Sequence, residues 1–206
     1  DMYFYSIDYD DIYEGAIDHN LDHYKHSDHL SIPLQETYVD SVYLPIINQA
    51  TLNHEIISNG HLVDYPGNYN LSYNNMNYSF TIEPSISGVE DGKTYNTSVV
   101  PKVSKGNVVL NNEAFSSEEI IDQPGYYHLE VSGIGDYLKV IDFTITSNID
   151  GVLDRQTYQR PLEITFNGKG YLNNTYVESP LIVEETGEYT LKIQGENNYL
   201  ETFNFI

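Results

Sequence analysis

Apolar and polar residues alternate strictly along short stretches of the chain. In Tyr127-His128-Leu129-Glu130-Val131, the odd-numbered residues are apolar or aromatic and the even-numbered ones are polar. A period of two places successive side chains on opposite faces of a β-strand. We therefore expect a strand here with one face in a core and the other in water.

This stretch belongs to a longer segment that is written more than once. The segment starting at Gly88 begins again at Gly151, 63 residues later, and Gly125–Val131 matches Gly187–Ile193. A degenerate copy around Pro66–Tyr73 lies upstream, and its final hairpin is shorter. Repeats of this kind predict stacked structural units. The predicted domains are a divergent one at residues 1–82, with a His/Asp-rich insertion, followed by residues 83–145 and 146–206.

The turns inside each repeat are too short for helical crossovers between parallel strands. Leu110-Asn111-Asn112-Glu113 and Gly133–Asp136 each have the length and composition of a hairpin turn. We predict an all-β fold of antiparallel β-sandwich domains, each with about seven short strands. The junctions at Pro84 and Thr146–Asn148 are short, so the domains are expected to lie end to end.

Two elements of the repeat resemble known immunoglobulin-like proteins. The Gly-x-Tyr-x-Leu-x-Val element at Gly125–Val131 looks like the sixth strand of an immunoglobulin fold, with Leu129 where antibody domains place a cysteine. The order of Gly-Val-x-Asp, Leu-Asn-Asn, Gly-x-Tyr-x-Leu and Phe-Thr-Ile resembles the bacterial Ig-like repeats of Gram-positive-type surface proteins. The resemblance covers residues 83–206 well and 33–82 loosely. It implies tandem Ig-like domains that serve as stalks or, in some proteins, as adhesive domains, without catalytic residues.

The composition of the chain limits the classes of partner that it can bind and indicates where in or outside the cell it is located. The 206 residues carry 9 Lys and Arg against 31 Asp and Glu, a net charge of −22, which disfavours nucleic acid as a partner. No apolar run approaches the roughly 18 to 20 residues that span a bilayer, so no membrane insertion is expected. The chain has no cysteine and opens at Asp1 without a signal-peptide pattern. We expect a mature or excised extracellular part of a cell-surface protein.

A His/Asp-rich stretch outside the repeats is the first candidate for metal binding. His19, His23 and His26 would share one side of a helix, and Asp22 adds a carboxylate, a reasonable ligand set for Zn²⁺ or Ni²⁺. The sequence gives no sign of the supporting shell that a metal site needs. A solvated loop inserted in the first domain is therefore the favoured interpretation.

Carboxylates near the predicted junctions are the second candidate. They are Glu83 and Asp91 at one junction and Asp150 and Asp154 at the other. Ca²⁺ takes six to eight oxygen ligands in loose geometry and could stiffen a junction. The favoured alternative is that these charges keep the domains soluble and mutually repulsive.

Tyrosines without a predicted core are the third candidate, because exposed aromatics stack on sugars or anchor protein contacts. The predicted binding face consists of Tyr3, Tyr5, Tyr9, Tyr13 and Tyr24. No catalytic motif occurs, so we expect no enzyme. The leading hypothesis is a stalk that joins other domains of a larger surface protein. The alternative is an adhesive module whose first domain recognises a host or cell-surface protein or glycan.

Overall fold

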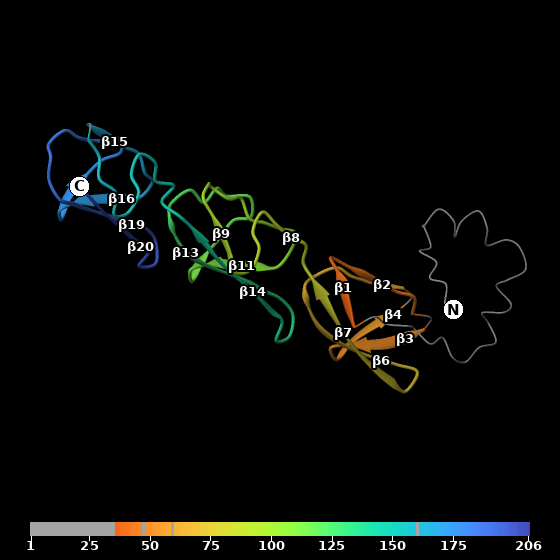
Figure 1. Cartoon of the computed structure of the whole chain (residues 1–206). Coiled ribbons are helices and arrows are strands. Elements are labelled where there is room, and N and C mark those ends of the chain that lie inside the picture. Colours follow the sequence, from red (N-terminus) through yellow and green to blue (C-terminus); the bar gives the residue numbers. More distant parts are fainter. Residues whose placement is uncertain (1–35, 47, 59, 160) are drawn as a thin grey trace, which may run out of the picture. The chain divides into compact units, whose positions relative to one another are not determined.

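The computed structural model describes residues 36–206 except for 47, 59 and 160 (Figure 1). Within these residues every regular element is a β-strand. No helix in this part of the chain is long and apolar enough to cross a membrane. We use the word module for each of the three predicted repeats and number them along the chain.

The first module forms one five-stranded sheet and one two-stranded sheet. The large sheet has the order β1-β7-β6-β3-β4, and β2 pairs with β5. Its strands are β1 (Thr37–Val39), β2 (Val42–Leu44), β3 (Gln49–Leu52), β4 (Glu55–Ser58), β5 (His61–Val63), β6 (Gly67–Tyr73) and β7 (Met76–Glu83).

The second module repeats this plan. Its large sheet has the order β12-β11-β13-β14-β9, and β10 pairs with β8. An isolated bridge between Val99 and Ile121 takes the place of the β2–β5 pair. The strands are β8 (Ile86–Ser87), β9 (Lys93–Tyr95), β10 (Lys102–Val103), β11 (Asn107–Leu110), β12 (Glu113–Ala114), β13 (Gly125–Ser132) and β14 (Leu138–Ile145).

The third module has a four-stranded sheet, β17-β16-β19-β20, and the pair β15-β18. Its strands are β15 (Leu162–Ile164), β16 (Lys169–Leu172), β17 (Thr175–Val177), β18 (Leu181–Val183), β19 (Tyr189–Gln194) and β20 (Leu200–Phe205). The described residues thus give seven strands to each of the first two modules and six to the third, close to the predicted seven.

Parallel pairing of an early strand with the last strand recurs in each module. β1 pairs with β7 and β9 with β14 in parallel, and a single parallel bridge joins Gln156 to Phe205. All other pairs of named strands are antiparallel. Two sheets of this connectivity enclosing one core form an immunoglobulin-like β-sandwich. The predicted all-β, Ig-like fold class is confirmed.

The core lies between the two sheets of each sandwich and follows the predicted alternation. In β13, Tyr127, Leu129 and Val131 are buried, whereas Tyr126 is 51% exposed. The third module differs in one respect from expectation. Tyr189 matches the buried Tyr127 in the repeat, but it is only half-buried at the edge of the cluster around Leu191.

The repeated tyrosine near the start of each of these strands closes a tyrosine corner, in which the hydroxyl donates to a carbonyl four residues upstream. The donor–acceptor pairs are Tyr69 to Tyr65, Tyr127 to Gln123 and Tyr189 to Glu185, at 2.8, 2.8 and 3.0 Å. Each tyrosine also stacks on a phenylalanine of the last strand, with ring centroids 5.2 to 5.4 Å apart. The degenerate first repeat therefore keeps the same structural core as the other two.

Asn-rich hairpin turns require a left-handed backbone, which asparagine tolerates better than most residues. Asn111 and Asn112 have φ of 52° and 68°, and Asn173 and Asn174 have 49° and 67°. The first Asn of the turn also ties two hairpins together. Asn111 Oδ1 accepts from the His128 amide at 2.9 Å, and Asn53 and Asn173 make the same bond in their modules.

Candidate functional site

The loop that closes the last hairpin of the second module contacts the first module through the backbone. The Ile134 amide donates to the Pro66 carbonyl at 2.8 Å, and the Asn68 amide donates to the Ile134 carbonyl at 3.0 Å. Gly67 and Ile134 are thereby paired as a parallel β-bridge. The tip of one hairpin thus pairs with the preceding module through a single β-bridge.

The third module meets the second in the same way, 58 to 62 residues later along the chain. The Glu196 amide donates to the Pro124 carbonyl at 2.8 Å, and the Tyr126 amide donates to the Glu196 carbonyl at 3.4 Å. Gly125 and Glu196 form the parallel bridge. Because the same backbone contact occurs twice, it is a property of the repeat. We call the Pro-Gly side of this contact the acceptor edge and the hairpin side the donor turn.

Close backbone approach explains why glycine stands on both sides of the contact. A Cβ on Gly133 would lie 2.0 Å from the Pro66 carbonyl oxygen, and a Cβ on Gly195 would lie 2.0 Å from that of Pro124. On the acceptor side, a Cβ on Gly125 would lie 2.9 Å from Cβ of Glu196. No side chain fits at these distances, so only glycine allows the turn to dock.

Side chains add charged and hydroxyl contacts at the first junction. Asp40 accepts hydrogen bonds from the Ser85 amide, at 2.8 Å, and from the Ser104 hydroxyl. The Ser104 hydroxyl is the main cause that lowers the pKa of Asp40 below its usual value, followed by Ser85. Lys105 Nζ lies 2.7 Å from Asp64 Oδ2. These bonds join residues on both sides of the first junction.

The second junction uses a buried serine and aromatic rings instead. Ser147 is fully buried, its hydroxyl donates to Glu201, and its amide donates to the Tyr199 hydroxyl at 3.1 Å. The rings of Tyr126 and Tyr199 lie 5.4 Å apart, and Asn197 Nδ2 donates to the Tyr126 carbonyl at 2.7 Å. Burial raises the pKa of Tyr199 well above its ordinary value.

Tyr137 takes the place in the second module that Tyr199 has in the third, but its hydroxyl is buried without a hydrogen-bond partner in the described part of the chain. The sequence explains this difference. Pro84 stands where the next repeat has Ser147, and proline has no amide hydrogen to donate. Burial raises the pKa of Tyr137 to about 12, in line with a hydroxyl that stays neutral.

Each carboxylate proposed for calcium has its own local environment. Asp91 Oδ1 accepts from the Asp142 amide at 2.9 Å, and Asp154 Oδ1 accepts from the Asn204 amide at 2.8 Å, so both tie a loop to the last strand. Glu83 Oε1 forms an ion pair with Lys139 Nζ at 3.8 Å. Asp150 pairs through its backbone with Thr165. Among residues 36–206, outside the three gaps, no three His, Asp or Glu side chains gather closely enough to hold a metal. Calcium at the junctions stays a prediction.

The other two candidates from the sequence fall outside the described residues. These are the metal ligands His19, Asp22, His23 and His26 and the binding face Tyr3, Tyr5, Tyr9, Tyr13 and Tyr24. Both stay predictions.

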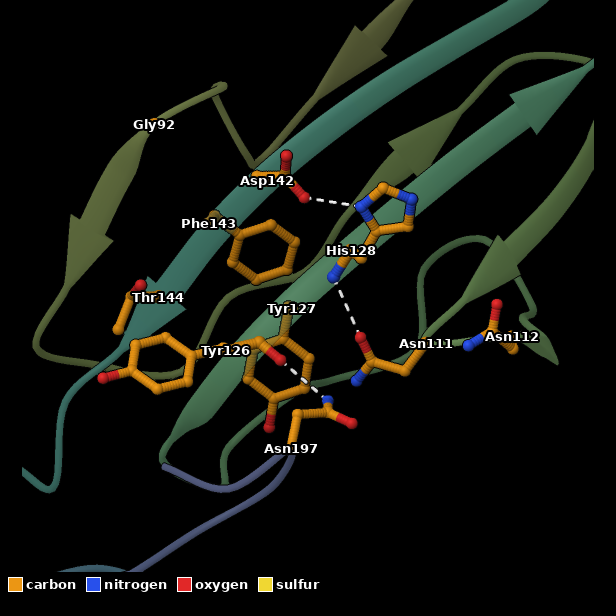
Figure 2. Close-up of a pocket in the computed structure, with 10 residues that line it drawn as sticks. All are labelled: Gly92, Asn111, Asn112, Tyr126, Tyr127, His128, Asp142, Phe143, Thr144 and Asn197. Carbon is orange, nitrogen blue, oxygen red and sulfur yellow. Dashed lines mark hydrogen bonds and ion pairs between the residues drawn. The ribbon is translucent and has the colours of Figure 1, made fainter. Parts of the chain in front are cut away.

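A surface hollow of about 490 Å³ lies over β13 and β14 of the second module (Figure 2). His128 points along it, with Nδ1 2.6 Å from Asp142 Oδ1 and Nε2 3.0 Å from Glu130 Oε1. The bond to Asp142, followed by the one to Glu130, raises the pKa of His128. Asn197 of the third module closes one side through its bond to Tyr126.

The His128–Asp142 pair has counterparts in the other modules. Ser79 donates to Asn70 at 2.8 Å, and Thr190 donates to Asn204 at 3.0 Å, between the same two strands. The ionic pair in the second module is therefore a variant of a cross-strand hydrogen bond that the fold keeps in each repeat. Because the bond recurs in all three modules, we assign the His128–Asp142 pair a structural role.

Sequence reasoning missed the donor turns and the acceptor edges. The available signal was that Gly133 and Gly195 occupy matching positions at the start of five-residue turns, Gly133–Tyr137 and Gly195–Tyr199. The first module has a two-residue turn, Asn74-Asn75, at that place. Neither Gly133 nor Gly195 has a positive φ, so the close backbone approach, and not a left-handed turn, accounts for glycine at these positions.

No protein-family model and no curated protein matches the chain. Among solved structures, the chain is similar to hemolin, an insect immune protein with a domain arrangement that has implications for homophilic adhesion. The identity is 11% and the TM-score 0.22, and the match covers 68% of this chain and 54% of hemolin. The chain thus spans about half of hemolin's length. The Ig-like assignment rests on the strand connectivity of the chain itself.

Proposed function

We propose that the chain is a non-catalytic spacer, or stalk, within a bacterial cell-surface protein, outside the cell. The observation that carries the proposal is the repeated junction, in which a donor turn adds to the acceptor edge of the preceding module. An Ig-like fold suits a structural or adhesion-type role, and a spacer needs modules whose junctions resist bending. Its partners are then other domains of the larger protein that it holds apart.

The described surfaces of the three modules are those expected of a spacer. Exposed large apolar side chains occur on each module, for example Tyr43, Tyr126 and Tyr176, at 57%, 51% and 56% exposure. An adhesive module would concentrate such side chains on one module. Within the described residues they are spread over all three modules, and the backbone contact at the junctions recurs.

Small-angle X-ray scattering tests the spacer proposal. A module with strands of about six residues is on the order of 30 to 40 Å long, so three modules end to end should approach about 100 Å. A maximum dimension near that of a compact globule of the same mass would contradict the proposal.

The adhesive alternative has its own test. The full chain would be applied to an array of glycans and host-matrix proteins, beside a variant that lacks residues 1–82. A spacer gives no signal above background in either case. A saturable signal that disappears when residues 1–82 are removed would establish the adhesive function and place recognition in the first module.

A further inference from the structure

The third module has an acceptor edge of its own. Thr186-Gly187-Glu188-Tyr189 aligns with Pro66-Gly67-Asn68-Tyr69 and with Pro124-Gly125-Tyr126-Tyr127. In the first two modules the donor turn covers this edge, so that both prolines and both glycines are buried. In the third module Thr186 and Glu188 are exposed and Gly187 is half-buried. The third edge is built like the other two and lies open.

The space and the hydrogen-bonding groups for a donor turn are present there. A Cβ on Gly187 would meet only the ring of its own Tyr189, at 3.6 Å, whereas a Cβ on Gly67 would meet Ile134 at 2.7 Å. The Thr186 carbonyl and the Glu188 amide, which correspond to the groups that bond the turn in the first two modules, have no hydrogen bond within the described residues. A hollow of about 270 Å³ lies beside this edge, lined in part by Thr186 and Gly187.

We propose that this edge is a docking site for the donor turn of a further Ig-like module of the same kind. The incoming residue after the turn's glycine would donate its amide to the Thr186 carbonyl and accept from the Glu188 amide, as Ile134 does at the first junction. This inference deepens the spacer function and rests on it for its biological use. It extends the described junctions to a surface that no described residue covers.

A second copy of this chain is not the proposed occupant, because no turn among its described residues is both suitable and free. Its first module closes its last hairpin with Asn74-Asn75, which lacks the glycine and the five-residue length. Its other two donor turns are already docked on Pro66 and Pro124. The repeat is therefore directional, because both occupied acceptor edges are filled by the module that follows in the chain.

Charge indicates which kind of module fits best. At the first junction Lys105, just before Gly106, pairs with Asp64, two residues before the Pro-Gly of the acceptor edge. Glu184 holds the Asp64 position in the third module, and it is exposed. A module with Lys before this glycine, like the second one, would pair with Glu184. The third module has Asn167 at that place and would not.

The test appends a second copy of residues 82–145 directly after Ile206, which occupies the repeat position of Thr81. Hydrogen exchange of the Glu188 amide is measured in the full chain with and without the appended module. Docking is expected to slow this exchange by at least about tenfold. The matched control carries Gly133→Ala in the appended copy only, and should exchange like the chain without it. Thermal unfolding and circular dichroism establish that the appended module is folded in both.

The Asn68 and Tyr126 amides, measured in the same samples, separate the two proposals. If both are protected but Glu188 exchanges equally fast with and without the folded appended module, the docking site is refuted and the spacer stands. If Asn68 and Tyr126 also exchange freely, the junctions themselves fail, and the spacer proposal fails with them. Equal protection of Glu188 by the appended module and by its Gly133→Ala form would also overturn docking by the donor turn.

Discussion

The two junctions share one backbone contact and differ in almost every side chain around it. At both, a glycine-led turn bonds to the carbonyl before an acceptor glycine, at 2.8 Å. Around it, the first junction places Asp40 against serines and Lys105 against Asp64, whereas the second buries Ser147. The backbone geometry is therefore the constant part of the junction, and the side chains are free to vary.

This difference also shows where a junction is imperfect. The second junction satisfies the buried Tyr199 hydroxyl with the Ser147 amide, and the first leaves the Tyr137 hydroxyl without a donor because Pro84 has none. A proline makes the connection stiffer but costs a hydrogen bond. The two junctions thus represent two solutions: Pro84 stiffens the first connection, and the Ser147 amide hydrogen-bonds the buried tyrosine hydroxyl at the second.

The largest effect should come from the cores of the second and third modules. Leu129 and Leu191 are fully buried at equivalent places in β13 and β19. Replacement of either by alanine should lower the free energy of unfolding by about 2 to 5 kcal/mol, because a cavity is left. Hydrogen exchange should show that Leu129→Ala loosens both junctions and Leu191→Ala only the second. Unchanged melting of both variants would mean that the core lies elsewhere.

Next in size is the loss of a single junction. Gly195→Ala places a methyl group where the Pro124 carbonyl oxygen lies, so the turn must lift off and two backbone hydrogen bonds are lost. A loss of about 1 to 3 kcal/mol of coupling between the second and third modules is expected. Gly133→Ala should do the same at the first junction alone. Two-module fragments and differential scanning calorimetry measure this coupling, and additive unfolding of the wild-type modules would argue against it.

Tyr137 and Tyr199 occupy matching positions at the two junctions but differ in hydrogen bonding, so their phenylalanine variants should differ in stability. Tyr199→Phe removes a hydroxyl that accepts from Ser147, and it should cost about 0.5 to 1.5 kcal/mol. Tyr137→Phe removes a buried hydroxyl that has no partner in the described structure, so stability should stay equal or rise. Urea unfolding of the two variants measures the contrast. Equal losses would show that Tyr137 finds a partner after all.

The smallest effect is a pH dependence confined to the second module. Asp142 and Glu130 raise the pKa of His128 above its ordinary 6.5, so the folded state binds the proton more tightly than the unfolded state. The stabilisation is complete below the unfolded-state pKa and disappears as the pH rises through the folded-state value. His128→Gln should therefore cost more at pH 5.5 than at pH 8.5, by at most about 1 kcal/mol for so exposed a pair. A larger cost at pH 8.5 would contradict a raised pKa of His128 in the folded state.

Much of the fold could be predicted from the sequence because its signals are local. The alternation around Leu129 determines the buried face, and Asn111-Asn112 determines a hairpin turn, whatever the rest of the chain does. The partial exposure of Tyr189 could not be predicted, because it depends on what covers the edge of the third module. The same holds for the junctions, where Gly133 and Pro66 lie far apart in sequence and their contact depends on two modules at once.

The central claim is that the donor turns hold neighbouring modules in a fixed relation, and a distance measurement across one junction tests it most directly. The chain has no cysteine, so Glu113→Cys and Glu178→Cys, both at exposed positions, give two unique sites for spin labels. Double electron–electron resonance should then show one narrow distance distribution. Gly195→Ala should broaden it, and Gly187→Ala, which meets no atom closer than 3.6 Å, should leave it unchanged. A distribution that is equally broad with and without Gly195→Ala would contradict the account.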